Sequence, residues 1–213
     1  MGDLENYQLQ IAQCHLCVDA GFLEHANPIF SGSAKAKIYF FGQSPGSVED
    51  KVGRPFSGRA GRTLWRWLCE AGVGDEKFLR ENVYFASVTR CYPGKHISGS
   101  GDRVPSKREI ELCSRWWKGE LVLLRPKLIV CIGALAASLL VGNMRLDELV
   151  GTRVKLKKEL VSEFVLMGYD ATNVDVVVLP HPSGRSVWLN DKRHAEKLKF
   201  ALDLIKKAKA DLL

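Results

Sequence analysis

Four short apolar runs recur along the chain, and segments with helical spacing of apolar residues lie between them. The runs cover residues 37–42, 82–89, 127–132 and 174–180. Strands that are apolar at nearly every position are typical of a parallel sheet whose two faces are both covered by helices. The pattern therefore predicts an α/β protein with a mainly parallel sheet.

The helical segments alternate with these runs. We expect helices over residues 3–12, 60–72, 75–81, 105–124, 134–142 and 191–212. Pro105 followed by Ser106 is a favourable helix opening. Residues 145–170 have a weaker pattern, which we interpret as a short helix and a pair of strands. No repeat, low-complexity tract or linker interrupts the sequence, so we expect residues 1–213 to form one domain.

Composition adds a partner class and a compartment. The chain has 31 basic and 24 acidic residues, a net charge of +7, which favours a polyanionic partner. The longest apolar stretch, residues 128–142, is too short to cross a bilayer. The N-terminus has neither a basic segment nor an apolar signal core, so we expect a cytoplasmic protein without membrane association, acting as a monomer.

Six cysteines in a chain without a secretion signal favour a metal site over a disulfide framework. Cys14 and Cys17 form a CxxC pair, whereas Cys91 and Cys113 follow much later. Four thiolates that converge on one point can enclose an iron–sulfur cluster or a zinc ion. The simpler alternative is that Cys91 and Cys113 are buried core thiols. We assign Cys69 and Cys131 to the core, because both lie on apolar faces.

The loop that follows the first apolar run, residues 42–61, is named the opening loop here. It contains the runs Gly42–Gly46 and Gly53–Gly61, and between them the acids Glu49 and Asp50. Glycine lets the backbone approach a ligand closely, and the carboxyl end of a strand is where an α/β sheet normally holds its ligand. Acids, an aromatic residue and two arginines in this loop suit chemistry on a nucleotide.

Four motifs in this order resemble the iron–sulfur uracil-DNA glycosylases, namely the thermostable family 4 and its family 5 relatives. They are the opening loop, the four cysteines, the strand entry Arg125-Pro126-Lys127 and the motif His181-Pro182-Ser183. The resemblance runs from about residue 10 to residue 205. Residues 53–61 are closer to family 4, whereas residues 87–91 lean towards family 5.

The resemblance implies a fold, a cofactor and an activity. The fold is a three-layer α/β/α sandwich around a four-stranded, mainly parallel sheet. The cofactor is a [4Fe–4S] cluster held by Cys14, Cys17, Cys91 and Cys113. The activity is hydrolysis of the bond between uracil and its sugar in DNA, the first step of base excision repair. The alternative is an iron–sulfur protein that binds damaged or single-stranded DNA without turnover.

Glycosidic hydrolysis needs groups for the leaving base, the sugar cation and the water. The base must first leave the helix stack, and Phe56 is expected to stack on it. Without the surrounding motif, Phe56 reads as an ordinary core phenylalanine. His181 is expected to stabilise the departing anion by a hydrogen bond, with backbone groups of Gly42 and Gln43 holding the base.

Two positions depart from family 4. Gln43 stands where that family has glutamate, and an amide can position a water but cannot take its proton. Glu49 is therefore our candidate for polarising the water or balancing the sugar cation, with Asp50 as the fallback. Ser87 stands where family 4 has asparagine. A hydroxyl discriminates bases less sharply than an amide, so we expect a broader range, including hypoxanthine.

The remaining expectations concern DNA. Ser183, Gly184 and Arg185 are expected to grip phosphates beside the flipped nucleotide, and Arg59 does the same from the opening loop. His96 lies in the glycine-rich loop 92–104 and is expected to contact solvent or phosphate, with a covalent role as the remote alternative. The lysines of the last helix are expected to form a solvated face.

Overall fold

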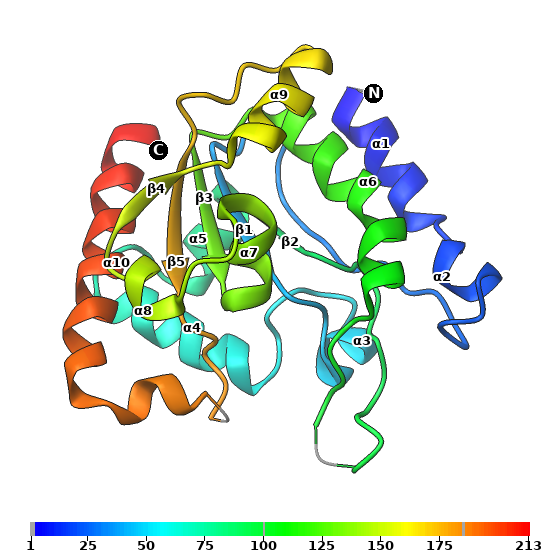
Figure 1. Cartoon of the computed structure of the whole chain (residues 1–213), viewed down its shortest axis with the longest axis horizontal. Coiled ribbons are helices and arrows are strands. Elements are labelled where there is room, and N and C mark those ends of the chain that lie inside the picture. The colour runs from blue at the N-terminus through cyan, green and yellow to red at the C-terminus, as the bar shows by residue number, and fades with distance from the viewer. Residues whose placement is uncertain (1–2, 100, 185) are drawn as a thin grey trace.

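The structure, a computed structural model, describes residues 3–99, 101–184 and 186–213, which fold around a five-stranded sheet (Figure 1). Its strands are β1 (Ile38–Gly42), β2 (Tyr84–Ser87), β3 (Leu128–Ile132), β4 (Arg153–Lys155) and β5 (Asp175–Leu179). Their order across the sheet is β2-β1-β3-β5-β4. The first four of these are mutually parallel, and β4 runs antiparallel to β5. The four strands predicted from the sequence are thus confirmed.

Helices cover both faces of the sheet and the segments around it. They are α1 (Asp3–Ala12), α2 (Leu16–Asp19), α3 (Ser47–Val52), α4 (Arg59–Glu70), α5 (Glu76–Asn82), α6 (Lys107–Leu124), α7 (Ala134–Val141), α8 (Leu146–Leu149), α9 (Lys158–Leu166), the 3₁₀ turn η1 (Val187–Asn190) and α10 (Lys192–Leu212). The side of the sheet that carries Phe41 packs on Trp117 of α6, with ring centroids 5.5 Å apart. The opposite side carries Phe85, which packs on Trp65 of α4 at 5.4 Å.

The predicted count of four strands was wrong, because β4 adds a fifth. This strand has three residues, and two of them, Arg153 and Lys155, are exposed cations that both pair with Asp175 of β5. So short and charged a strand has no apolar alternation to reveal it. The pair of strands expected within residues 145–170 is also wrong, since α8, β4 and α9 occupy that segment.

The connections diverge at the carboxyl ends of β1 and β3. The chain leaves β1 towards β2 on one side of it, whereas β3 lies on its other side. In open α/β sheets, ligands bind in the crevice at such a switch point. The opening loop follows β1, and Gly133 follows β3 directly, so both lie at this crevice.

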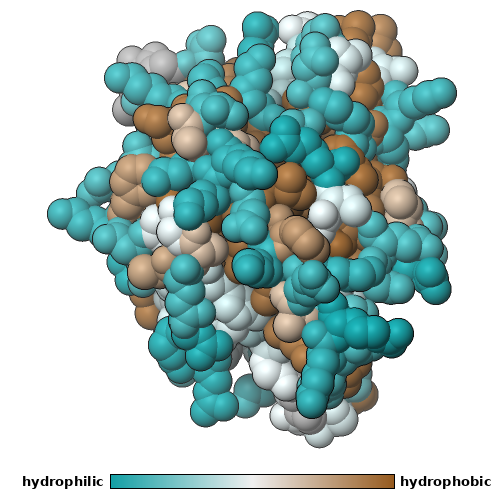
Figure 2. All heavy atoms as spheres, turned by 90° about the vertical axis from the view of Figure 1, so that its left-hand side faces the viewer, coloured by the Kyte–Doolittle hydropathy of each residue, from teal (hydrophilic) through white to brown (hydrophobic). Residues whose placement is uncertain are grey.

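The outer face of α10 is largely hydrophilic. Lys192, Lys199, Lys206 and Lys207 are exposed there, and Figure 2 shows hydrophilic side chains over most of this side of the molecule, with apolar residues scattered between them. Among the described residues, no helix combines the length and the apolar character that a membrane crossing would need. The apolar stretch 128–142 forms β3 and most of α7.

Candidate functional site

The structure brings three of the predicted base-binding residues together at the ends of β1 and β2. Gly42 and Ser87 are partners in the parallel register of these strands. A Cβ placed on Gly42 would lie 3.3 Å from Cζ of Phe56 and 3.3 Å from Oγ of Ser87. The absence of a side chain at Gly42 therefore leaves space between an aromatic ring and a hydroxyl, as a flat base would require.

Phe56 is held in a backbone conformation that is uncommon for a residue with a side chain. Its φ is 54°, in the left-handed region. Gly61 of α4 allows this, since a Cβ there would lie 1.9 Å from the Phe56 carbonyl oxygen. The indole of Trp65 also donates a hydrogen bond to that oxygen at 3.0 Å. Edge contacts with Trp65 and Phe85 fix the ring, and strain of this kind is typical of functional sites.

Glu49 braces the opening loop. Its side chain is buried, and its two carboxylate oxygens accept hydrogen bonds from the backbone N–H groups of Gly58 at 2.7 Å and Gly46 at 3.1 Å. These bonds join the first and last glycine-rich parts of the loop. Ionised carboxylate oxygens have further acceptor positions, so Glu49 retains the capacity to accept a bond from water.

The other two polar residues of the loop differ in what they contact. The Asp50 carboxylate accepts from Asn27 Nδ2 at 3.2 Å and contacts His25 Nε2 at 3.1 Å, which ties it to the segment after the CxxC pair. Gln43 is half-buried directly after β1, and its carbonyl accepts from the Thr89 N–H at 3.3 Å. Gln43 thus starts beside the base-binding residues, whereas Asp50 faces the cysteine-bearing segment.

His181 follows β5, and its ring is oriented by its own turn. The backbone N–H of Ser183 donates to His181 Nδ1 at 3.3 Å, and the Ser183 hydroxyl lies 2.9 Å from the same nitrogen. Because Nδ1 accepts from an N–H, the neutral ring carries its proton on Nε2. Burial lowers the pKa of His181, which favours this neutral form. The result is an imidazole with a free Nε2–H donor.

Gly133 lies beneath this imidazole, a contact that the sequence did not reveal. A Cβ on Gly133 would lie 3.5 Å from both Cβ and Cδ2 of His181. Of the predicted DNA contacts, Arg59 and Gly184 are exposed, whereas Ser183 is half-buried and occupied with His181. Arg185 lies outside the described residues.

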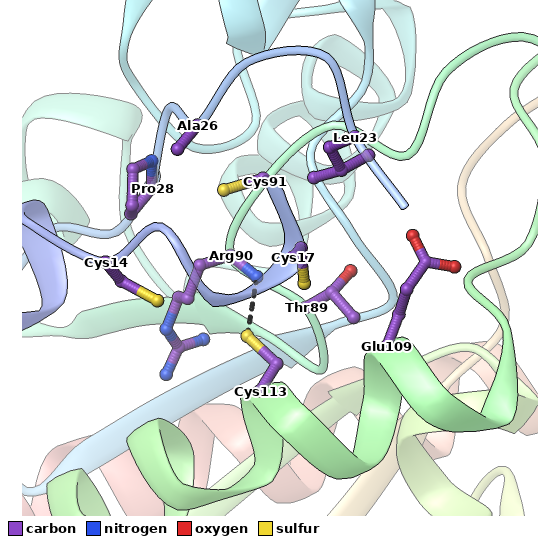
Figure 3. A pocket seen from close by; sticks show the side chains of 10 residues that line it. All are labelled: Cys14, Cys17, Leu23, Ala26, Pro28, Thr89, Arg90, Cys91, Glu109 and Cys113. Carbon is purple, nitrogen blue, oxygen red and sulfur yellow. Dashed lines mark hydrogen bonds between the residues drawn. The ribbon is translucent and has the colours of Figure 1, made fainter. Parts of the chain in front are cut away.

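The four predicted metal-binding cysteines line one pocket. Figure 3 shows their sulfur atoms around this pocket, with Cys113 projecting from α6 and Cys91 from the segment after β2. All four are free thiols. Of the two cysteines assigned to the core, Cys131 is buried in β3 but Cys69 is exposed, since it lies on the outer side of α4.

Two N–H groups point at these sulfurs. The Arg90 backbone donates to Cys113 Sγ at 3.2 Å, and the Trp116 indole donates to Cys14 Sγ at 3.2 Å. Burial raises the pKa of Cys17 to about 11. It also raises the pKa of Cys91 and Cys113 to about 12. Within the described ranges, no three His, Cys, Asp or Glu side chains are grouped as ligands of a single metal ion.

A buried polar network connects this pocket to the base-binding residues, and sequence reasoning missed it. Arg90 is 1% exposed, and its guanidinium donates to the Ser87 carbonyl and pairs with Glu120 of α6, which is fully buried. Tyr39 and Tyr84 donate to the Glu120 carboxylate at 2.6 and 2.9 Å. Arg90 therefore contacts Cys113 through its backbone and the end of β2 through its side chain. Neither residue carries a sequence pattern that indicates burial.

Comparisons with known proteins agree with this arrangement. The sequence model of the uracil DNA glycosylase superfamily matches residues 29–205. A type-4 uracil-DNA glycosylase from Archaeoglobus fulgidus is 33% identical over 152 residues, which are 71% of this chain and 68% of the relative. The type-4 enzyme of Thermotoga maritima is 31% identical over 179 residues, which are 84% of this chain and 79% of the relative.

A weaker similarity reaches a second type. The type-5 uracil-DNA glycosylase of Pyrobaculum aerophilum is 28% identical over 115 residues, 49% of this chain and 48% of the relative. The type-4 relatives cover more of the chain at higher identity. Taken with the sheet, the opening loop and the turn at His181, these matches show that the chain belongs to the uracil-DNA glycosylase superfamily, as a type-4-like enzyme.

Proposed function

We propose that this enzyme hydrolyses the N-glycosidic bond of uracil in DNA and thereby begins base excision repair. The observation that carries the proposal is the His181 turn, which presents a neutral Nε2–H at the same sheet edge as Phe56, Gly42 and Ser87. A flipped base would stack on Phe56 and fill the space above Gly42.

His181 stabilises the leaving group in this mechanism. Breaking the bond between the sugar and the base leaves the bonding electrons on the base, whose carbonyl oxygen gains negative charge. The Nε2–H of His181 donates to that oxygen, and a donor fixed in advance by its surroundings costs no reorganisation during the reaction. Ser183 acts as a positioning residue, because its N–H fixes which ring nitrogen carries the proton.

Gln43 and Glu49 serve the sugar and the water. The Gln43 amide orients a water towards the sugar carbon, and the Glu49 charge balances the cation that develops there. The water adds to the sugar and releases its proton to solvent or to the departing base. Because the Glu49 oxygens also hold Gly46 and Gly58, its removal would disturb the loop as well as the charge.

Ser87 sets the range of bases in this proposal. Its side chain is 7% exposed and lies beside Gly42 at the pocket floor. A rotating hydroxyl donates or accepts as the base requires, whereas an amide fixes both roles. We therefore include hypoxanthine, and other deaminated bases, among the substrates.

Cys14, Cys17, Cys91 and Cys113 would hold a [4Fe–4S] cluster. A zinc ion needs its sulfurs at about 2.3 Å from one point. The four thiols instead surround a pocket and are not grouped around one ion position, at least among the described residues, which favours a larger group. The raised thiol pKa values mean that the thiolates need the charge of iron to form. The cluster, bound by four cysteines, supplies structural support and no hydrolytic step.

The test uses labelled duplexes that carry uracil, hypoxanthine, xanthine or a thymine mismatch, incubated with the protein and then treated with alkali. Strand breaks at uracil are expected. His181→Asn should lower kcat by about 10²–10³, the usual cost of one anion-stabilising donor. An unchanged thermal midpoint in this variant is the control for folding. Binding without breaks by the wild-type protein would refute catalysis, and cleavage confined to uracil would refute the broad range assigned to Ser87.

A further inference from the structure

Residues 92–104 form a hairpin with a defined backbone. Lys95 and Asp102 are partners in an antiparallel bridge. The His96 N–H donates to the Gly101 carbonyl at 2.7 Å, and the Arg103 N–H donates to the Gly94 carbonyl at 2.9 Å. These bonds run along both arms of the hairpin, so the described part of its tip is presented on an ordered base.

The base of the hairpin is fastened to the body of the protein. The Arg103 guanidinium donates to both carboxylate oxygens of Glu109 on α6, each at 2.7 Å. The Tyr92 hydroxyl donates to Asp102 Oδ1 at 2.9 Å. Because Cys91 immediately precedes Tyr92, the hairpin also starts from the cysteine pocket. A paired guanidinium and a pocket ligand thus hold its two arms.

The hairpin lies beside the opening loop. A Cβ placed on Gly46 would lie 3.2 Å from Asp102 Oδ2 and 2.8 Å from Glu49 Oε2, so the arm that carries Asp102 packs against the loop that presents Phe56. Figure 1 shows the hairpin projecting past α3 at the end of the molecule where the parallel strands finish. It therefore projects on the side from which DNA would reach the base-binding residues.

An isoleucine stands at the hairpin tip. Ile97 is 99% exposed, more than any other large apolar side chain among the described residues. His96 and Ser98 flank it, and the Ser98 N–H donates to His96 Nδ1 at 3.2 Å, which fixes the turn. Single exposed apolar residues are common on proteins. Ile97 differs from them by its position on an anchored projection at the substrate end, with Lys95 close by in the sequence.

We propose that Ile97 is a wedge that enters the base stack of duplex DNA beside the flipped nucleotide, while Lys95 contacts the phosphates. Opening a stacked base costs free energy, and an apolar side chain inserted between base steps fills the space that the base leaves. The inference rests on the proposed glycosylase function and assigns a residue outside the base pocket to the duplex substrate.

The wedge predicts a dependence on DNA structure. Ile97→Ser should lower kcat/KM at least about tenfold on a U·A duplex and less on a U·G mismatch, which opens more easily, and should leave single-stranded DNA within about twofold. Ile97→Leu should retain duplex activity. The matched control is Leu166→Ser, because Leu166 is 89% exposed on α9, far from the hairpin in Figure 1. This control should behave as wild type on all three substrates.

Two outcomes would overturn the wedge: unchanged duplex activity in Ile97→Ser, or an equal loss on duplex and single strand. A second readout separates the wedge from the glycosylase proposal. Duplexes with 2-aminopurine next to uracil should brighten when wild-type protein binds, and Ile97→Ser should lose this increase. If wild-type protein cuts none of the DNAs, the proposed function fails, and the fluorescence change alone decides for or against the wedge.

Discussion

Phe56 owes its orientation to the residue beneath it. Its left-handed backbone would relax if the space under its carbonyl were not limited, and Gly61 and the Trp65 indole together define that space. A glycine inside a helix is normally unfavourable by about 0.5–1 kcal/mol relative to alanine. Its presence in α4 is explained by close backbone approach, and the same contact shapes the pocket.

Gly61→Ala should therefore be destabilising although alanine favours helices. The new Cβ would meet the Phe56 carbonyl oxygen at 1.9 Å, so the opening loop or α4 must move. We expect a loss of about 1–3 kcal/mol in the free energy of unfolding, as for overpacked sites, together with weaker substrate binding. Chemical denaturation and KM measurements provide the check. Gly184→Ala is the stability control, since a Cβ there meets nothing within 4 Å; a stabilised Gly61→Ala protein would contradict the packing role.

His181 links stability to pH. Burial lowers the pKa of His181 in the folded protein, so the unfolded chain binds this proton more readily. The free energy of unfolding should consequently fall as the pH drops below the ordinary histidine pKa of about 6.5. Denaturation at about pH 7.5 and about pH 5.5 should show a larger fall for wild type than for His181→Gln. Identical falls would mean that His181 does not titrate in this range.

At the scale of elements, one buried ion pair joins both sides of the site. Arg90 follows β2, Glu120 lies in α6 and Tyr39 lies in β1, so the network joins two strands to the helix that covers them. Removing charges from water is costly, and a buried pair of this kind is retained only with further hydrogen bonds. The two tyrosine hydroxyls supply them.

Glu120→Gln should leave the Arg90 charge buried without its counterion. Breaking a buried pair by altering one partner costs about 3–5 kcal/mol. We expect this loss in urea denaturation, with little change in the fold of the remaining protein. Glu70→Gln is the control, because its pair with Arg66 is exposed and 4.0 Å long, and such pairs contribute about 0–1 kcal/mol. Equal stability of the two variants would remove the structural role of the network.

The long elements could be predicted because their apolar residues repeat at clear intervals. Buried parallel strands such as β3 are apolar throughout, and α6 has both a capping serine and a regular apolar face. β4 is too short for a pattern, and α3 is hidden among the glycines of the opening loop. The cysteines could be grouped by type, but burial of Arg90 depends on a partner thirty positions away, which no local pattern encodes.

For the molecule as a whole, the cysteine pocket attaches the N-terminal segment to the sheet. Cys14 and Cys17 come from this segment, whereas Cys91 and Cys113 come from the body of the fold. Few other bonds share that task. Ile29 N–H donates to the Arg90 carbonyl at 2.8 Å, and Ser31 pairs with Phe85. A cluster held by all four thiols would therefore act as a cross-link.

Cys17→Ala should accordingly affect folding more than chemistry. We expect loss of the brown visible absorption and a fall of at least about 5 °C in the thermal midpoint, since 1 kcal/mol corresponds to about 2–4 °C at this chain length. The fraction that remains folded should still cleave uracil-containing DNA. Cys69→Ala is the matched control, because Cys69 is exposed and does not line the pocket. An unchanged midpoint in Cys17→Ala would show that the pocket holds no stabilising group.

The edge strand β4 has a consequence for self-association. An open sheet ends in unpaired backbone groups, which invite a second chain to add its own strand. Here that edge is only three residues long, and it displays the side chains of Arg153 and Lys155. A second copy aligned against it would bring cations face to face, and would compete with the bonds that both make to Asp175. The same three residues that escaped the sequence pattern thus guard the sheet against growth into fibres.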